Sequence, residues 1–522
     1  MPVVTSLIVL PILGALALLA LRDDEANEGL IRNAALAVSM VVFAVTLVMW
    51  ARFDPSSADF QFVERHDWIP AFGVSYAVGV DGISLLLIVL TGFLTPIALL
   101  CSWESVHKKT RAFCMFVLLL EAAMIGVFVS LDLFLFYVFW DAMLIPMYFL
   151  IGIWGYDRRI YASIKFLLYT MAGSVLMLLA ILGLAVLHSQ QTGSYSFDLL
   201  KLYELSIPSN IQFWFFLAFA LAFCIKVPLF PFHTWLPDAH VQAPTAGSVI
   251  LAGVLLKMGT YGLVRFAFPL FPEAAAYFAP YIGLLAVIGI IYGALVAMIQ
   301  PDMKKLVAYS SVSHLGFVVL GITAMNTNGM QGAVYQMLNH GISTGGLFLI
   351  VGMLSDRRHT RLISEFGGLK KVTPRLVAAF LIVTLSSIGL PGLNGFVGEF
   401  LILLGAFAWK PMFATFAATG VILSATYMLW MFQRVNYGQV SEKNASLPDL
   451  KPREWTLLVP VIAMSIIMGV FPNIFLKPMA PSIERMLTQV RRGTQIRVQT
   501  EPLTPPTASL AQAGATTTEV GR

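Results

Sequence analysis

The sequence predicts an all-α polytopic membrane protein with about fourteen transmembrane helices. Ten of them are expected to form two five-helix repeats of opposite topology, each with one interrupted helix. Hydrophobic residues make up 58% of the 522 residues and charged residues only 12%, and the mean hydropathy is +0.81. About fourteen apolar stretches are long enough to cross a bilayer. No soluble domain has this composition.

The apolar stretches follow one another with short connections. In chain order they are 3–21, 31–51, 82–101, 111–129, 131–153, 161–187, 211–230, 242–268, 275–299, 303–323, 330–354, 375–409, 412–434 and 454–476. Residues 51–81 lie between the second and third stretch and are expected to form structure on the membrane surface. The tail from about residue 490 is rich in Thr, Pro, Ala, Gln and Gly, which predicts a disordered and dispensable extension.

Lysine and arginine are distributed unevenly over the connections. Of the 33 such residues, nineteen lie in odd-numbered connections, five in even-numbered ones, six after the last stretch and three inside stretches. Because cytoplasmic loops carry the excess of positive charge, the odd connections are expected in the cytoplasm. Both termini are then expected on the outer face.

The first interrupted helix is 211–230, in the middle of the chain. An apolar run reaches Lys226, and Pro228 and Pro231 then break it. A lysine at mid-bilayer costs about 2.5–3.5 kcal/mol on insertion scales. A broken helix with a charge at this depth is tolerated only inside protein or against water. The stretch therefore indicates a working site for a small cation, a proton above all.

The second interrupted helix is 375–409, which is too long for one straight span. Gly389, Pro391 and Gly392 predict an unwound joint, followed by a buried Glu399. Paired interrupted helices in the two halves of a chain are typical of transporters built from repeats. The expected division is 1–110 for three N-terminal helices, 111–268 and 275–436 for the two repeats, 454–478 for the last helix, and 479–522 for the C-terminal extension.

Ionisable residues recur inside the stretches of both repeats, which predicts a row of protonatable sites at the bilayer midplane. They are Glu121, Asp141, Lys165, Lys226, Lys257, His314, His340 and Glu399. The second, third and fourth helices of the first repeat carry Asp141, Lys165 and Lys226. The matching helices of the second repeat carry His314, His340 and Glu399.

The members of the row differ in the roles expected of them. Lys226 is the primary site, and Asp141 is its counter-ion, whose movement would switch proton loading. Lys257 would relay the proton, and Glu399 would be the exit acid.

Other readings stay open for several members of the row. Asp141 could merely neutralise a lysine. His314 has hydroxyl neighbours that can hold water, and the pKa of histidine suits a relay, but a structural role for His340 is also open. Glu121 and Lys165 remain ambiguous. His233 and His240 are expected to be structural or to lie at an entrance.

Cofactor-binding patterns do not occur in the sequence. The cysteines Cys101, Cys114 and Cys224 lie in apolar runs, so no disulfide framework is implied. There is no metal-ligand spacing, no Walker loop and no GxGxxG after a strand pattern. The chain itself is therefore expected to hold neither a redox cofactor nor a nucleotide.

Two long motifs carry a family resemblance. Residues 227–246 (VPLFPFHTWLPDAHVQAPTA) and 308–316 (AYSSVSHLG) resemble the antiporter-like proton-pumping subunits of respiratory complex I, and the likeness extends to about residue 480. The segment from Phe139 to Phe149 and the acid at Glu399 are similar to the M type of NADH–quinone oxidoreductase. The L and N types carry a lysine in that broken helix.

The resemblance implies a fourteen-helix fold with two inverted five-helix repeats, and a proton-translocating subunit whose complex couples NADH:quinone electron transfer to pumping. It implies Lys226 as central carrier with Asp141 as partner, Lys257 and His314 as relays, His340 as a link and Glu399 as terminal acid. The family usually has glutamate where this chain has Asp141. Aspartate is shorter by about one C–C bond, so the ion pair with Lys226 is expected to be longer or water-bridged.

The resemblance also implies the surroundings. NADH, FMN, Fe–S clusters and quinone would be bound by partner subunits, the lateral neighbours would be the L- and N-type subunits, and the location would be the bacterial inner membrane. Three alternatives remain: a subunit of a multisubunit cation/proton antiporter, the membrane arm of an ion-pumping hydrogenase, and a structural subunit without a proton path. The cost of eight buried ionisable residues argues against the last.

Overall fold

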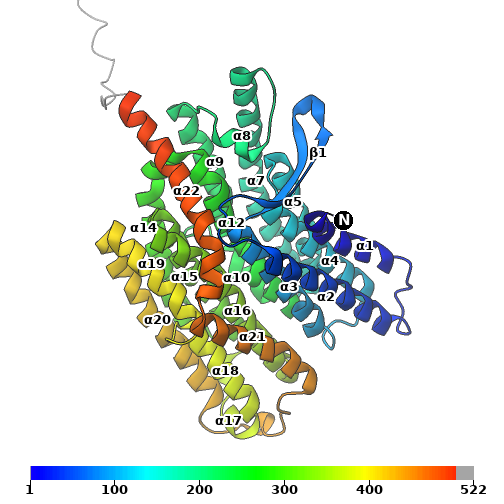
Figure 1. Cartoon of the computed structure of the whole chain (residues 1–522). Coiled ribbons are helices and arrows are strands. Elements are labelled where there is room, and N and C mark those ends of the chain that lie inside the picture. Colours follow the sequence, from blue (N-terminus) through cyan, green and yellow to red (C-terminus); the bar gives the residue numbers. More distant parts are fainter. Residues whose placement is uncertain (1, 501–522) are drawn as a thin grey trace, which may run out of the picture.

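The computed structural model describes residues 2–500 and is a bundle of long helices (Figure 1). Among the described residues, twelve helical segments are long and apolar enough to cross a membrane. Three shorter apolar helices accompany them, namely Val3–Leu18, Pro374–Ser387 and Asn394–Trp409. The fold is therefore the helical membrane fold that the sequence predicts, and each predicted apolar stretch coincides with helix over most of its length.

The elements follow in chain order. The first half contains α1 (Val3–Leu18), α2 (Glu28–Arg52), β1 (Gln61–Ile69), η1 (Pro70–Phe72), β2 (Val74–Val80), α3 (Gly82–Cys101), α4 (Thr110–Val129), α5 (Leu133–Ala142), α6 (Leu144–Trp154), α7 (Arg159–Thr192), α8 (Leu199–Tyr203), α9 (Ser209–Lys226) and α10 (Trp235–Gln242). Next come α11 (Thr245–Ile250), η2 (Leu251–Leu255), α12 (Leu256–Gly262), η3 (Leu263–Ala267), α13 (Phe268–Leu270), α14 (Pro272–Met298), α15 (Met303–Thr323) and α16 (Thr327–Arg358). The rest contains η4 (Ile363–Glu365), α17 (Leu369–Val372), α18 (Pro374–Ser387), α19 (Asn394–Trp409), α20 (Pro411–Asn436), η5 (Glu442–Asn444), α21 (Pro452–Val470) and α22 (Asn473–Thr500).

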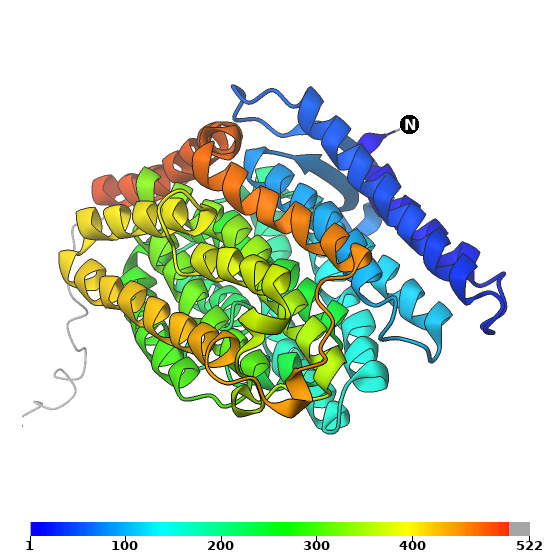
Figure 2. The same ribbon diagram turned by 90° about the horizontal axis from the view of Figure 1, so that it is seen from below.

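The bundle has an N-terminal edge and a C-terminal edge. Seen from below, α1 and α2 lie along one side, and α18 to α20 lie on the other (Figure 2). The middle helices are the most buried: α16 is fully enclosed over an eighteen-residue window, as is the interrupted segment from α11 to α13. Lys257 and His340, which lie on these two segments, are therefore in the interior of the protein.

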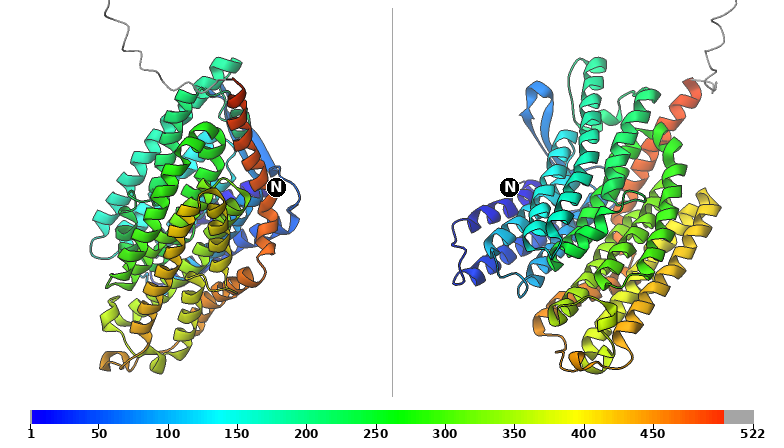
Figure 3. Two further views of the ribbon diagram at one scale, coloured as in Figure 1. Left: turned by 90° about the vertical axis from the view of Figure 1, so that its left-hand side faces the viewer. Right: turned by 180° about the vertical axis from the view of Figure 1, so that it is seen from behind.

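One end of the bundle, here called the hairpin face, carries the antiparallel β1–β2 hairpin (Figures 1 and 3). The hairpin lies within residues 51–81, for which the sequence predicts structure on the membrane surface. Backbone nitrogen Val4 N donates to Glu64 of β1 at 2.8 Å, and Arg485 of α22 pairs with Asp59 at 2.6 Å. Both ends of the described chain therefore lie on the same face as the hairpin.

The opposite end, here called the loop face, gathers the connections 102–109, 155–158, 243–244, 299–302, 359–373 and 437–451. They bind one another through charged side chains: Lys304 Nζ donates to the Ala243 carbonyl at 2.6 Å, and Arg361 lies 3.3 Å from Asp302. These are the basic odd-numbered connections of the sequence, so that charge asymmetry corresponds to one physical face.

The C-terminal part differs from the prediction. The expected single helix at 454–478 is two helices, α21 and α22, and residues 490–500, predicted to be disordered, continue α22. Met479, Ile483 and Leu487 are buried at helical spacing and pack α22 against α3, α14 and α16 (Figure 1). The sequence did not predict α22 because prolines and polar residues lie between its buried apolar residues and make the amphipathic pattern difficult to recognise. Residues 501–522 lie outside the described part of the chain.

Candidate functional site

Lys226 is the last residue of α9, as the sequence predicts. Pro228 has no N–H, so the Cys224 carbonyl accepts instead from Leu229 N at 2.8 Å, and the Ile225 carbonyl accepts from the Trp235 indole at 2.8 Å. The helix end is thereby closed within the protein. The Lys226 side chain is completely buried.

The surroundings of the Lys226 ammonium are soft and aromatic. Its Nζ lies 3.3 Å from Met143 Sδ, 5.6 Å from the centre of the Trp140 ring and 5.3 Å from that of Phe166. Cation–π contacts of this kind hold a charge where water is scarce. Lys226 can therefore hold a proton beside the Asp141 helix without a carboxylate in contact.

The direct Asp141–Lys226 ion pair expected from the sequence does not form. Asp141 Oδ1 accepts from Ser174 Oγ of α7 at 2.5 Å, and no oxygen of Asp141 lies within 4.0 Å of Lys226 Nζ in the described structure. The helix is also interrupted at Met143, between α5 and α6. Asp141 is therefore bonded to α7 and not to Lys226.

Lys257 lies on α12, a seven-residue helix between the π-helical segments η2 and η3. π-Helical turns inside α-helices occur frequently at functional sites. The Lys257 ammonium donates to the Ala252 carbonyl and lies 2.7 Å from Nδ1 of His340 on α16. An amine and an imidazole at this distance can share one proton directly. The sequence predicted both residues but not this contact.

A second proton-sharing pair joins His314 of α15 and Glu399 of α19, with His314 Nδ1 and Glu399 Oε1 3.0 Å apart. Gln336 Nε2 donates to the same carboxylate oxygen at 3.1 Å, and Asn339 Nδ2 donates to Gln336 Oε1 at 2.9 Å. All of these side chains are buried. Glu399 is thus fixed in place by two donors, and the amides Gln336 and Asn339 are members of the site that the sequence did not identify.

The unwound joint before Glu399 shapes its position. Gly389 and Gly392 have φ of +75° and +92°, a region open mainly to glycine. A Cβ at Gly389 would lie 2.8 Å from Glu399 Oε2. Asn394 accepts from Ser386 Oγ at 2.5 Å across the joint. The predicted break is confirmed, and its first glycine makes room for the carboxylate.

The two pairs face one another. The His314 and His340 rings have centroids 6.1 Å apart, and Nε2 of each ring is buried without a hydrogen-bond partner among the described residues. Buried polar atoms are almost always satisfied by protein or by water. The geometry therefore fits water between two imidazoles, which links Lys257–His340 to His314–Glu399.

Two expected members of the row make no contact with these pairs. Lys165 is in the second turn of α7 and binds Asp238 at 2.7 Å and the Thr234 carbonyl at 3.0 Å, so it is not at the midplane row. Both oxygens of Glu121 are completely buried without a partner in the described structure. The Thr95 hydroxyl beside it donates to the Thr91 carbonyl instead.

The histidines of the 227–246 motif are aromatic contacts. His233 packs against Phe230 and Tyr292, with ring centroids 5.7 and 5.1 Å away. His240 is completely buried, stacks on Phe348 at 4.6 Å, and has no partner for either ring nitrogen among the described residues.

A buried ion pair between Asp81 and Arg265 was not predicted. Arg265 Nη2 lies 2.5 Å from Asp81 Oδ2, and its Nε donates to the Tyr261 hydroxyl at 3.2 Å. Burial alone would raise the pKa of Asp81, but the charge of Arg265 and the Ser84 N–H hold it below its ordinary value. The pair ties the start of α3 to η3. The sequence signal that could have drawn attention to Asp81 is the helix-capping pattern from Asp81 to Ser84.

No group of three or more His, Cys, Asp or Glu side chains among the described residues is placed to hold a metal ion. What the site offers chemically is a buried row of an amine, two imidazoles and a carboxylate, joined by two short contacts.

Comparisons with known proteins show which family the chain is similar to. The family model for "NADH:quinone oxidoreductase/Mrp antiporter, TM" matches residues 130–424, more than half of the chain, and that for "NADH-ubiquinone oxidoreductase chain 4, amino terminus" matches 25–127. NADH-quinone oxidoreductase subunit M of Rhodobacter capsulatus is 46% identical over 91% of this chain and 94% of its own. Chain 4 of NADH-ubiquinone oxidoreductase from Marchantia polymorpha is 44% identical over 92% and 96%.

Solved structures show the same fold. A chain of respiratory complex I from Thermus thermophilus is 34% identical with a TM-score of 0.85, over 93% of this chain and 99% of that one. A chain of the Mrp complex from Dietzia sp. is 20% identical with a TM-score of 0.82, over 94% and 100%, which shows likeness of fold alone. The chain belongs to the family of membrane subunits of NADH:quinone oxidoreductase and the Mrp antiporters.

Proposed function

We propose that this chain is the proton-translocating M-type subunit of the membrane arm of NADH:quinone oxidoreductase. The observation that carries the proposal is the pair of short contacts in the interior, Lys257–His340 and His314–Glu399. Four ionisable side chains from α12, α15, α16 and α19 meet there, and such residues inside a membrane mark ion and proton paths. The Mrp-type alternative shares the family model and the fold, whereas the named relatives at 42–46% identity are subunits of NADH-quinone or NADH-ubiquinone oxidoreductases.

The proton path in this proposal starts at Lys226 and ends at Glu399. Lys226 holds a proton beside Trp140 and Met143, Lys257 and His340 share the next, and water bridges His340 to His314 and Glu399. Gln336 orients the acid. Unpartnered Nε2 atoms on both histidines support the water bridge.

Asp141 would act as the switch of the first step. Its carboxylate is held by Ser174 and is free of Lys226. An ion pair at about 4 Å is worth about 4 kcal/mol at an effective dielectric constant near 20. Moving a proton against about 150–200 mV costs about 3.5–4.6 kcal/mol. Forming and breaking one Asp141–Lys226 contact is therefore large enough to drive one proton step.

The setting follows from the family. Electron transfer from NADH to quinone would occur in other subunits, with their FMN and Fe–S clusters, and the lateral neighbours would be the L- and N-type subunits. In a bacterial inner membrane, the basic loop face would be cytoplasmic. The hairpin face, with both ends of the described chain, would then be outside.

The test is Glu399→Gln in the assembled complex. Glutamine keeps the size and the contact with Gln336 but cannot release a proton. We expect proton uptake per NADH oxidised to fall, with assembly on a native gel unchanged. Glu484→Gln, on the exposed side of α22, is the matched control. Wild-type pumping by Glu399→Gln and by His314→Ala would contradict the proposal.

A further inference from the structure

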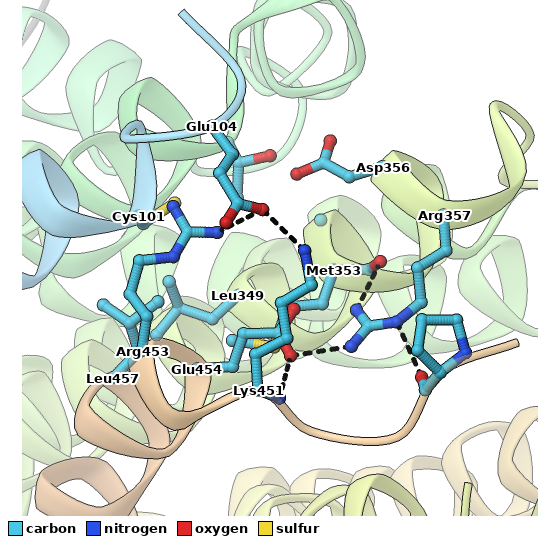
Figure 4. Close-up of a pocket in the computed structure, with 13 residues that line it drawn as sticks. Cys101, Glu104, Leu349, Met353, Asp356, Arg357, Lys451, Arg453, Glu454 and Leu457 are labelled. Atoms are coloured by element: carbon cyan, nitrogen blue, oxygen red, sulfur yellow. Dashed lines mark hydrogen bonds and ion pairs between the residues drawn. The ribbon is translucent and has the colours of Figure 1, made fainter.

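A cavity opens on the loop face at the end of α16. It has a volume of about 270 Å³ and is lined by Cys101, Thr245, Gly352 and Asp356, among others (Figure 4). A larger cavity of about 1150 Å³ shares Glu104, Thr245 and Asp356 with it. Both lie on the side of the odd-numbered connections. Water on the loop face therefore has access to the end of α16.

Asp356 is distinct among the acids of this cavity. Glu104 is paired with Lys451 at 3.0 Å and Arg453 at 2.9 Å, and Glu454 with Arg357 at 2.7 Å. Asp356 is exposed and makes no hydrogen bond or ion pair with the described residues, as Figure 4 also shows. Its carboxylate is therefore free to take up and release a proton.

A row of residues along α16 joins Asp356 to the interior row. Residues four apart are neighbours on a helix, and a series of them forms a ridge that winds slowly round it. From Asp356 this ridge carries Gly352, Phe348, Thr344 and then His340, which contacts Lys257. The ridge is polar at both ends and at Thr344.

Unpartnered polar atoms lie along this ridge in the buried part of the protein. The Thr344 hydroxyl, both ring nitrogens of His240 and Nε2 of His340 are buried and have no hydrogen-bond partner among the described residues. His240 stacks on Phe348, one turn from Thr344. Buried polar atoms are almost always satisfied by protein or by water. The position of these atoms along the ridge indicates a hydrated passage.

We propose that protons are taken up from the loop face at Asp356 and pass along this ridge of α16, by way of Thr344, to the Lys257–His340 pair. Water carries the proton past Phe348, and the Asp356 carboxylate collects it from solvent. The inference rests on the proposed function, because it supplies the second relay of the proton path. It places an inlet at the second repeat, separate from Lys226.

Accessibility tests the passage independently of pumping. In membranes with the full complex, Cys101, Cys114 and Cys224 are replaced by serine, and Thr344→Cys is introduced. Ag⁺ applied to the loop face of inverted vesicles is expected to protect this thiol from later alkylation. The matched control is Thr91→Cys, whose native residue is equally buried but has its hydroxyl satisfied by the Leu87 carbonyl. Equal reactivity of the two cysteines would overturn the inference.

Substitutions of Thr344 and Asp356 test whether protons pass through this passage during turnover. Thr344→Val removes the hydroxyl at constant size. We expect its NADH-driven proton uptake to fall about fivefold, because the hydrogen bond between this hydroxyl and the water of the passage is lost. Thr344→Ser keeps the hydroxyl and is expected to stay near wild type. Asp356→Asn is expected to slow uptake and Asp356→Glu to preserve it. If one of these variants fails to assemble, the Ag⁺ protection of Thr344→Cys decides whether the passage exists. Full pumping by assembled Thr344→Val and Asp356→Asn would overturn the inference, and pumping retained in Lys226→Ala as well would overturn the proposed function.

Discussion

The ammonium nitrogen of Lys257 lies 2.7 Å from Nδ1 of His340, and this contact joins α12 to α16 across the middle of the molecule. The amine and the imidazole come from the two repeats that the sequence predicts, so in that division the pair would be the junction between them. A proton that arrives at either residue is within one hydrogen bond of the other.

The junction makes Lys257 and His340 act as one unit. Lys257→Ala and His340→Ala are each expected to lower proton uptake by at least about tenfold, since a positioned acid–base group contributes about 10²–10⁴-fold. Because they share one step, the double variant should be no worse than the poorer single variant. Uptake rates of the three assembled complexes measure this, and simple additivity would show that the residues act separately.

Gly389 provides space for Glu399, and Gly392 offers the matched comparison. Both residues have positive φ, so alanine strains the backbone at either position, but only at Gly389 would the Cβ lie against the carboxylate. We expect Gly389→Ala to reduce proton uptake more than Gly392→Ala at equal assembly. Equal losses would mean that backbone strain alone causes the effect.

The Asp81–Arg265 pair is expected to stabilise the N-terminal part of the bundle. Breaking a buried pair leaves an uncompensated charge and costs about 3–5 kcal/mol. Arg265→Met should therefore lower the amount of assembled complex and its temperature of inactivation. The double change Asp81→Asn with Arg265→Met should recover much of the loss. No recovery would assign the effect to the packing of Arg265 rather than to its charge.

The pH dependence of that stabilisation follows from the lowered pKa of Asp81. A carboxylate with a lowered pKa in the folded state contributes stability above its unfolded pKa of about 3.9, and loses it as the pH falls through the folded value. The difference in stability between wild type and Asp81→Asn should be constant from neutral pH to about pH 5, and should shrink below about pH 4. Inactivation temperatures over this range check it, and a difference that grows on acidification contradicts it.

Helix α22 is expected to be needed for assembly rather than dispensable. Ile483 is completely buried where α22 packs on the bundle. Ile483→Ala should cost about 2–5 kcal/mol and lower the yield of complex on a native gel. Glu484→Ala, one residue further and exposed, serves as control. Equal yields from both would show that α22 contributes little.

The sequence was sufficient for the elements whose signals are local. Apolar stretches, prolines after Lys226 and glycines before Glu399 predict helices and breaks, because each depends on a few adjacent residues. Side-chain directions depend on distant partners instead. Asp141 points to Ser174, Lys165 to Asp238, and Arg265 reaches Asp81 across 184 positions of sequence. Helix α22 was missed because its buried residues are separated by polar ones and its partners are far away in the chain.

The central claim is that buried Lys226 carries the coupled proton. The direct measurement compares Lys226→Ala with Lys165→Ala, in membranes where the complex assembles normally, and records NADH-driven proton uptake and NADH:quinone turnover together. Lys165 is a membrane lysine that pairs with Asp238 outside the interior row, so its loss should leave uptake near wild type. The account predicts a fall of at least about tenfold for Lys226→Ala. Wild-type uptake and turnover in that variant would contradict it.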